Sequence, residues 1–391
     1  MIWAITILIV PIAITYLVFP LVTIVMGHFA PEKPTVSEGK SYKVYLLMAA
    51  HNEESVMKAK LDTIVNSNFD KDQLVCYIGS DASTDQTDAI IKSYADRLPL
   101  KFFPFTERQG KPNIINTLVE HIKAEHALGE NDLFLLTDAN VTFHPDFISE
   151  MCSSFKDTEV GLVDGNIQNP ISMSGVGASE RQYLRIETKI KQAEGRLWGC
   201  SMGPFGGAFM MRAQLFQAVP PNFLVDDFFI FYHVLKSGKQ AIFNERAICY
   251  EAVSGDLKEE FRRKVRISTG NFQNTTYFFP YFLKLSKTHN VIFILHKLLR
   301  WISPVLAAII LMIAAAGSFN DPLWRNFCLI MISLLVGIPV LNYFLNQLNL
   351  RWKGVQGVAY LIIMNFALLI GFIKFIKGVE SNVWEPTKRK T

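Results

Sequence analysis

The stretch from Leu135 to Phe143, LLTDANVTF, decides how the rest of the chain is interpreted. Its first residues are apolar and typical of a buried strand, and the apolar run stops at Thr137 and Asp138. A carboxylate at the end of such a strand has two explanations. It either caps a turn, or it holds a ligand at the edge of a sheet.

Short β-rich runs alternate with helical patterns on both sides of this stretch, as in a parallel α/β sheet. The pattern predicts strands at 43–50, 73–80, 100–105, 132–137, 160–164 and 205–211. It predicts helices at 54–68, 84–97, 111–126 and 180–197. We therefore expect an α/β fold in the middle of the chain.

The composition indicates a membrane component, because 50% of the 391 residues are hydrophobic and the mean hydropathy is +0.21. The first apolar run, Ile2 to Met26, has no charged residue and is long enough to cross a ~30 Å hydrocarbon layer. A secretory signal peptide is the alternative, but no Lys or Arg precedes the run and no small-residue cleavage pattern follows it. Lys33, Lys40 and Lys43 come next, which favours an anchor followed by a cytoplasmic domain.

The C-terminal part contains three further uncharged stretches, at 301–320, 326–350 and 354–373. A buried soluble core is the alternative, but three such stretches in succession favour membrane spans. Three spans would place the basic tail Lys388 to Lys390 opposite the cytoplasmic domain. We therefore expect one stretch to be re-entrant or interfacial.

Cysteine usage and charge exclude other classes. The five cysteines are far apart and lack metal-ligand spacing, as expected for reduced thiols in the cytosol. The net charge of +4 is too small to indicate a nucleic-acid partner.

Polar segments follow three predicted strands: AAHNEES at 49–55, GSDASTDQT at 79–87 and TDAN at 137–140. Each has a structural explanation of its own, since Glu53 and Glu54 suit a first helical turn, and Asp81 and Asp138 suit capped turns. Because ligands bind beyond the carboxyl ends of parallel strands, three such segments together favour a binding edge.

The usual glycine-rich phosphate loops are missing, which weakens ATPase and dehydrogenase interpretations. A diphosphate is then most readily held by a divalent cation on carboxylate oxygens. Asp138, with Asn140 two residues later, suits Mg²⁺ or Mn²⁺.

The segments AAHNEE, SDASTDQT, TDAN, GGAFMMR, VDDFF and FRRKVR stand in the order and approximate spacing of the motifs of glycosyltransferase family 2. The chain resembles the membrane-embedded branch with cellulose, chitin, poly-N-acetylglucosamine and hyaluronan synthases. The resemblance covers about residues 40 to 275. It implies a Rossmann-like GT-A domain for nucleotide-diphospho-sugars, with transmembrane helices at both ends. The implied regions are an anchor at 1–30, a cytosolic GT-A domain at 40–255, amphipathic interfacial helices at 256–300, transmembrane helices at 301–376 and a tail at 377–391.

The resemblance also implies roles for individual residues. The donor, a UDP-sugar, would be contacted by Ala49, His51, Glu53 and Asp81, with Lys111 as a nearby basic residue. Asp138 and Asn140 match the metal motif, with Asn in place of the second Asp. Asp227, the second member of the pair Asp226-Asp227, would be the general base. Gly206 and Gly207 either let a sugar approach the backbone closely or form an ordinary turn.

The segment LKEEFRRKVRISTGN, from Leu257 to Asn271, matches the family's Gln-x-x-Arg-Trp motif only in part. Its arginines, Arg263 and Arg266, share a helix face, with Arg266 as the implied phosphate-binding residue and Arg263 in place of Gln. Ile267 replaces the Trp that helps polymer synthases to hold the acceptor. Glu259 and Glu260 are spaced to pair with Arg263 and Lys264.

These features predict an inverting glycosyltransferase, dependent on Mg²⁺ or Mn²⁺, that transfers a sugar to a polysaccharide or lipid-linked glycan. We expect it in the lipid bilayer of a bacterial plasma membrane. A single-addition enzyme acting on a lipid acceptor is the nearest alternative. A transporter is disfavoured because the three C-terminal stretches contain almost no ionisable residues. A nucleotide-sugar receptor without turnover is disfavoured by Asp227 and the two arginines.

Overall fold

The computed structural model describes residues 2–31, 41–169, 176–251, 256–348, 350 and 352–379. Several residues used above lie outside these ranges: Lys33 and Lys40 before the domain, and the basic tail Lys388 to Lys390.

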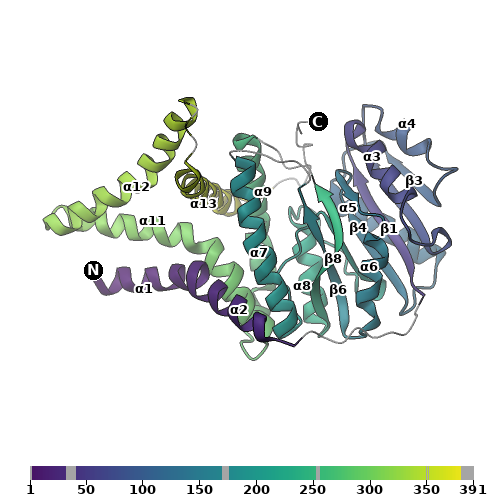
Figure 1. Ribbon diagram of the computed structural model, residues 1–391, viewed down its shortest axis with the longest axis horizontal. Coiled ribbons are helices and arrows are strands. Elements are labelled where there is room, and N and C mark those ends of the chain that lie inside the picture. The colour runs from purple at the N-terminus through teal and green to yellow at the C-terminus, as the bar shows by residue number, and fades with distance from the viewer. Residues whose placement is uncertain are drawn as a thin grey trace.

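A sheet of eight strands forms the α/β domain, at the right of Figure 1. The strand order is β3-β2-β1-β4-β7-β6-β8-β5. The strands are β1 (Lys43–Ala50), β2 (Leu74–Asp81), β3 (Leu100–Phe105), β4 (Asp132–Thr137), β5 (Val141–Phe143), β6 (Val160–Gln168), β7 (Ala208–Arg212) and β8 (Gln240–Glu251).

Only part of this sheet is parallel. β3, β2, β1 and β4 run parallel to one another, so the carboxyl ends of β1, β2 and β4 meet at one edge as predicted. β7 is antiparallel to β4 and β6, and β5 is antiparallel to β8, so the prediction of a parallel sheet is wrong for β7 and β5. β6 and β8 are parallel to each other, as predicted for this kind of sheet. Alternation of strands and helices along a sequence does not fix strand direction, because a long helix can return the chain to either end of the sheet.

Helices cover both faces of the sheet, which explains why β1 is apolar at almost every position. Val44, Leu46 and Met48 pack on the face covered by α3 (Glu54–Val65), α4 (Thr87–Lys92) and α6 (Phe147–Ser153). The alternate residues Tyr45 and Leu47 pack on the other face, towards α5 (Lys111–Glu125) and α8 (Asp226–Lys236). Burial of both faces holds the strand ends rigidly beneath the polar turns that follow them.

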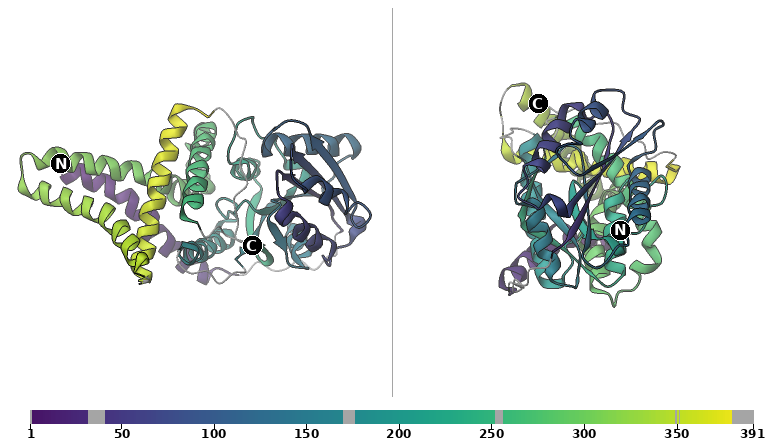
Figure 2. Two further views of the ribbon diagram at one scale, coloured as in Figure 1. Left: turned by 90° about the horizontal axis from the view of Figure 1, so that it is seen from above. Right: turned by 90° about the vertical axis from the view of Figure 1, so that its right-hand side faces the viewer.

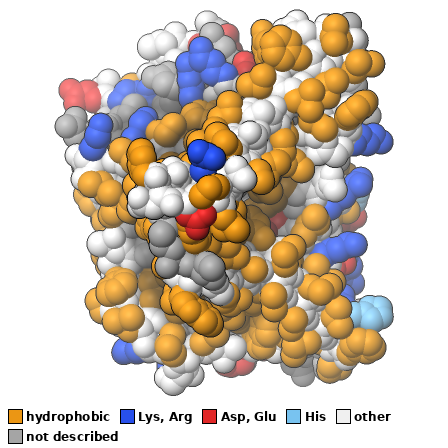
Figure 3. Space-filling model, turned by 90° about the vertical axis from the view of Figure 1, so that its left-hand side faces the viewer, with side chains coloured by type: hydrophobic (Ala, Val, Ile, Leu, Met, Phe, Trp, Pro, Cys, Tyr) orange, Lys and Arg blue, Asp and Glu red, His pale blue; other side chains and the backbone are white. Residues whose placement is uncertain are grey.

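The remaining helices lie on one side of the α/β domain (Figures 1 and 2). They are α1 (Ile2–Ala13), η1 (Ile14–Val18), α2 (Phe19–Phe29), α7 (Val176–Trp198), α9 (Leu257–Phe282), α10 (Thr288–Ile292), η5 (Phe293–Leu298), α11 (Leu299–Ser318), α12 (Pro322–Gln347) and α13 (Lys353–Lys377). Among the described residues, four continuous helical segments are long and apolar enough to cross a membrane: Trp3–Phe29, Thr288–Ser318, Pro322–Gln347 and Lys353–Lys377. This confirms the prediction of candidate membrane helices at both ends. Hydrophobic side chains cover most of the face that these helices present in Figure 3.

The second candidate span begins earlier than the sequence pattern predicts, at Thr288 instead of Trp301. Its first turns contain charged residues that the uncharged-stretch criterion excluded. His296, Lys297 and Arg300 face α7, where they meet Glu187 and Glu194. We call these five residues the buried seam, because they join the α/β domain to the apolar helices.

The buried seam is densely paired. His296 lies with Nδ1 2.6 Å from Glu194 Oε1 and with Nε2 3.2 Å from Glu187 Oε1. Glu187 also contacts Lys297 Nζ, and Arg300 Nη1 is 2.9 Å from its second oxygen. Because all five side chains are almost fully enclosed, these charges fix how the apolar helices sit against α7.

Candidate active site

The polar turns after β1 and β2 are tied to each other. His51 Nδ1 lies 2.7 Å from the Asp81 carbonyl oxygen, and Glu53 donates its backbone N–H to Thr87 Oγ1 at 2.8 Å. Ala49, at the end of β1, is in register with Gly79 of β2. The structure therefore brings together four residues predicted to contact the donor, all of them buried: Ala49, His51, Glu53 and Asp81.

Two non-glycine residues in these turns have a left-handed backbone, Asn52 with φ 50° and Ala82 with φ 54°. Asn tolerates this conformation, whereas Ala adopts it at a cost of about 1 kcal/mol or more. Such backbone strain concentrates at functional edges, where the surrounding structure holds it in place. It agrees with a ligand-binding role for this edge.

Asp81 already has several hydrogen-bond donors around its carboxylate. Gln109 and Gly110 donate backbone N–H groups at 2.5 and 3.2 Å, and Arg108 Nε lies 3.1 Å from Oδ2. Arg108 Nη1 is also 2.8 Å from His51 Nε2. Asp81 thus holds the loop before α5, and Arg108, which our sequence analysis missed, lies beside the predicted nucleotide residues.

Lys111, the first residue of α5, is the centre of a charged group that we call the active-site cluster: Lys111, Asp138, Asp226 and Asp227. Its Nζ lies 2.7 Å from Asp138 Oδ1, at the end of β4, and 3.6 Å from Asp226 Oδ2, at the start of α8. Burial lowers the pKa of Lys111, but Asp138 and Asp226 more than offset this, so the pKa lies above its usual range. A single ammonium thus gathers carboxylates from two elements far apart in the sequence.

Asp227 sits next to this ammonium, at the first turn of α8. Burial raises the pKa of Asp227, and the neighbouring Asp226 raises it further, to about 7. Its Oδ1 accepts a hydrogen bond from the Phe228 N–H at 2.7 Å. Its Oδ2 lies over Gly206, where an added Cβ would be only 2.2 Å away. Gly206 also has φ +86°, a conformation that other residues rarely adopt. A residue with a side chain at this position would therefore be strained and would clash with Asp227.

Asn140 and Arg263 are linked through a residue that our sequence analysis missed, Glu251. Asn140 Nδ2 donates to Glu251 Oε1 at 3.0 Å, and Arg263 Nη1 lies 3.9 Å from the same oxygen. Arg263 also pairs with Glu260 at 3.0 Å, as its spacing predicted. The side chain of Asn140 therefore joins the turn after β4 to the end of β8, and through Glu251 to Arg263 of α9, while its role as a metal ligand stays a prediction.

Helix α9 holds the segment that leads into Asp226. Arg266 Nη1 donates to the Leu224 carbonyl at 3.1 Å, and Asn274 Nδ2 donates to the Val225 carbonyl at 2.9 Å. Gln273 Oε1 accepts the Leu224 N–H at 3.1 Å. Arg266 thus lies near the active-site cluster, and α9 positions the Asp226-Asp227 pair, while phosphate binding by Arg266 stays a prediction.

Lys60 is a third residue that our sequence analysis missed. It is fully buried in α3, and its Nζ donates to Thr137 Oγ1 at 2.7 Å and to the Val141 carbonyl at 2.5 Å. These two partners flank Asp138, so Lys60 braces both ends of the predicted metal loop. Burial lowers the pKa of Lys60 to about 7. The signal was available in the sequence, because Lys60 falls within the apolar stripe Met57, Leu61 and Ile64 of one helix.

The predicted metal residues fit a cation that arrives with a diphosphate. Within the described ranges, no group of three or more His, Cys, Asp or Glu side chains is arranged to hold an ion by itself. However, Asp138 is 36% exposed, and Asp226 Oδ2 accepts no hydrogen bond from the described residues. Mg²⁺ is commonly bound by one or two carboxylates together with substrate phosphates, and these oxygens suit that arrangement.

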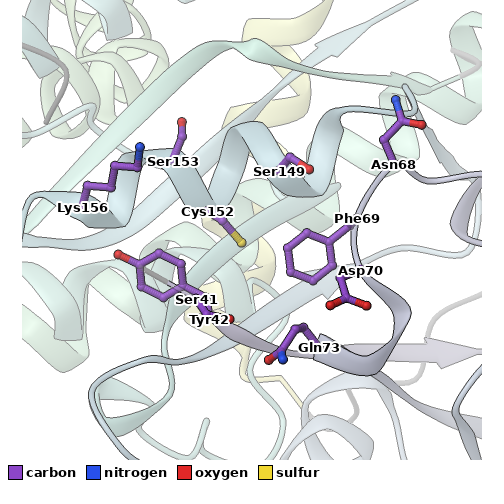
Figure 4. Close-up of a pocket in the computed structure, with 10 residues that line it drawn as sticks. All are labelled: Ser41, Tyr42, Asn68, Phe69, Asp70, Gln73, Ser149, Cys152, Ser153 and Lys156. Atoms are coloured by element: carbon purple, nitrogen blue, oxygen red, sulfur yellow. The ribbon is translucent and has the colours of Figure 1, made fainter. Parts of the chain in front are cut away.

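A separate pocket of about 380 Å³ lies at the other end of the strands (Figure 4). Its lining includes Tyr42, which precedes β1, and Gln73, which precedes β2, together with Phe69, Cys152 and Lys156. It contains none of the predicted site residues, because those follow the strands instead of preceding them.

Comparison with known proteins agrees with this geometry. The model of Glycosyl transferase family 2 matches residues 45–219, and that of Glycosyl transferase family group 2 matches residues 133–373. The second match extends from the active-site strand β4 into α13.

Two similar proteins have curated names. A "Probable glycosyltransferase YdaM" of Bacillus subtilis is 24% identical over 63% of this chain, and a "Poly-beta-1,6-N-acetyl-D-glucosamine synthase" of Staphylococcus aureus is 22% identical over 62%. The matches span 59% and 58% of those proteins' lengths.

A solved structure, "Mannosyltransferase PcManGT from Pyrobaculum calidifontis in complex with GDP-Man and Mn2+", aligns over 96% of this chain and 100% of its own, with a TM-score of 0.69 and 21% identity. The two share a fold, which confirms the expected GT-A architecture with apolar helices at both ends. Together with the family matches over more than half of the chain, these findings show that the chain belongs to glycosyltransferase family 2.

Proposed function

We propose that this chain is an inverting, metal-dependent glycosyltransferase that uses a nucleotide-sugar, with a UDP-sugar as the expected donor. The observation that carries this proposal is the active-site cluster, where Asp138 and Asp226 pair with the ammonium of Lys111 and Asp227 lies close enough for its pKa to respond to Lys111. The names of similar proteins support it, since one is a poly-N-acetylglucosamine synthase and another was solved with GDP-Man and Mn²⁺.

Asp227 is the proposed general base. With its pKa raised to about 7 by burial and by Asp226, its carboxylate can accept a proton near neutral pH. It takes the proton of an acceptor hydroxyl while that oxygen bonds to the anomeric carbon of the donor. The bond from the anomeric carbon to the diphosphate breaks on the opposite face, so the configuration inverts and the electron pair leaves with the diphosphate.

The leaving diphosphate needs positive charge, which Lys111 and Arg266 supply. A divalent cation held by Asp138, with Asn140 as the second predicted ligand, would neutralise further charge on the diphosphate. His51, Glu53 and the backbone around Ala49 form the proposed nucleoside side, where Asp81 and Arg108 keep the loop in place.

The acceptor is proposed to be a growing glycan or a lipid-linked saccharide at a membrane. The four candidate spans support a site held near a bilayer. We place the catalytic domain on the cytoplasmic side of a bacterial plasma membrane, where nucleotide-sugars are made. Because Ile267 replaces the acceptor-binding Trp of polymer synthases, single-sugar addition is the second form of the same proposal.

The test uses the full chain purified in detergent, with a panel of UDP- and GDP-sugars and either Mg²⁺ or Mn²⁺. Release of nucleoside diphosphate that depends on lipid extract and metal is the expected result. Product length then separates polymer synthesis from single addition. Donor binding without turnover would favour a receptor, and uptake into vesicles without nucleotide-sugar would favour a transporter.

A further inference from the structure

The last apolar helix, α13, has a different direction from the other candidate spans. In Figures 1 and 2, α1, α11 and α12 extend together away from the α/β domain, whereas α13 crosses them and runs along α9. Two hydrogen bonds join α9 to the backbone of α13. Ser268 Oγ donates to the Leu368 carbonyl at 2.8 Å, and Thr269 Oγ1 donates to the Gly371 carbonyl at 3.1 Å.

The side of α13 that faces protein combines small residues with Met364 and with two aromatic rings, Phe372 and Phe375, that pack on Phe272 of α9. Ala359, Ala367 and Gly371 are buried, and a Cβ at Gly371 would come within 2.4 Å of the Ser268 Cβ. Two helices can approach so closely only where one lacks a side chain. This packing fixes α13 alongside α9, and therefore alongside the domain that carries the active site.

The outer side of α13 is exposed and apolar along its whole length. Its members are Val358, Leu361, Phe366, Ile370, Ile373 and Ile376. This surface adjoins the exposed apolar surface of α12, with which α13 is in contact. Lysines mark both ends of the helix, Lys353 at its start and Lys374 and Lys377 in its last turn, and all three are exposed.

We propose that α13 lies in the plane of the membrane surface, on the side of the α/β domain, with its outer face against lipid acyl chains. Its lysines at both ends then reach the same layer of headgroups, as long cationic side chains do at a membrane interface. A spanning α13 would instead place Lys353 on one side and Lys374 and Lys377 on the other. Hydropathy alone makes α13 a candidate span, but its direction and its lysines fit an interfacial helix.

This arrangement has a consequence for the site. α9 is fixed to an interfacial helix on one side, and on the other it hydrogen-bonds to Leu224 and Val225, just before Asp226. The active-site cluster is therefore held at a constant height above the headgroups. The inference concerns topology alone and does not depend on the proposed reaction.

The test labels single cysteines in the full chain within sealed membrane vesicles, using a membrane-impermeant maleimide. Reporters are Lys353→Cys and Lys377→Cys at the two ends of α13, and Phe319→Cys at the turn between α11 and α12, where Phe319 is 88% exposed. The five natural cysteines are buried, which keeps the background low. We expect both lysine positions to react from one side and Phe319→Cys to react from the other. Labelling of Lys377→Cys from the Phe319 side overturns the proposal.

A depth measurement gives an independent reading. Spin labels at Leu361, Phe366 and Ile373 should show nearly equal depth for an in-plane helix. A helix that crosses the bilayer would separate Leu361 from Ile373 by about 18 Å, from a rise of about 1.5 Å per residue. A separation of that size overturns the proposal even if the labelled ends are inaccessible to maleimide.

Discussion

The active-site cluster and the buried seam contain the same kinds of side chain, but their charges are balanced differently. In the cluster, the carboxylates of Asp138, Asp226 and Asp227 share the ammonium of Lys111, and Asp138 is 36% exposed. In the seam, Glu187 and Glu194 meet three basic side chains, and no member is more than 13% exposed.

This difference indicates that the cluster serves the reaction and that the seam serves the stability of the fold. A group of carboxylates that outnumbers its cations and has access to solvent leaves negative charge available for a metal ion, a proton or a polar ligand. In the seam, Glu187 pairs with Lys297 and Arg300, and His296 contacts both glutamates, so this buried group offers nothing to a ligand and serves to join two parts of the fold. Variants in the cluster should therefore change rates, and variants in the seam should change stability.

The largest expected effect is on the cluster. Asp227→Asn removes the proposed base and should lower kcat by about 10³-fold, within the usual range for general-base catalysis. Donor affinity, measured by isothermal titration calorimetry, should stay unchanged because the remaining members of the cluster are intact. Asp62→Asn, an exposed carboxylate paired with Arg97, is the control and should retain full activity. Normal turnover by Asp227→Asn would remove this residue from the role.

The matching experiment in the seam is Glu187→Gln. It leaves His296, Lys297 and Arg300 without their shared anion, so the free energy of unfolding should fall by about 3–5 kcal/mol. Denaturant unfolding in detergent measures this loss. Glu245→Gln breaks a solvent-exposed pair with Arg196 and should leave stability nearly unchanged. The comparison fails if Glu187→Gln lowers kcat of the folded protein while its stability is unaffected.

A smaller effect is expected from Lys60, which touches the cluster only through the loop around Asp138. Lys60→Met removes the hydrogen bonds to Thr137 and Val141 and should raise the half-saturating Mn²⁺ concentration by about 10–100-fold, as for other residues that orient metal ligands. Transfer rate as a function of Mn²⁺ measures this shift, with Lys58→Met, exposed on the same helix, as the control. Lower stability with an unchanged Mn²⁺ dependence would leave Lys60 a purely structural role.

Much of the first half of the sheet could be predicted from sequence. β1 and β4 have the predicted bounds because both faces of these strands are buried, and nearly uninterrupted apolar runs make their ends sharp. β3 also has the predicted bounds, although it is the edge strand and is only partly buried. The second half could not be predicted as well. β8, from Gln240 to Glu251, contains Asn244, Glu245 and Arg246, which interrupt any apolar run, and it was missed.

The site shows the same division. Asp138 was singled out because it follows a strand with a clear pattern, and Asp227 because VDDFF resembles a motif of the family. Arg108 and Glu251 were missed because their importance depends on partners, Asp81 and Asn140, that are distant in sequence. The buried seam was missed for a related reason, since its lysine, arginine and histidine interrupt the apolar pattern that defines a span. Long-range pairing of charges is a property of the fold and leaves no local periodic signal.

The smallest expected effect concerns pH and tests whether the excess negative charge in the cluster matters. As pH falls through about 7, Asp227 takes up a proton and can no longer accept one from the acceptor, so kcat/KM should fall on the acid side. Asp226→Asn removes the negative charge that helps to raise this pKa, so activity should persist to lower pH. Burial of Asp227 remains, so its pKa should stay above its ordinary value. Asp146→Asn, 52% exposed and not among the charges that act on Asp227, should leave the profile unchanged. The contrary outcome is that kcat/KM of Asp226→Asn falls at the same acidic pH as that of the wild-type protein. In that case burial alone sets the pKa of Asp227, and the excess of carboxylates in the cluster has no effect on the reaction.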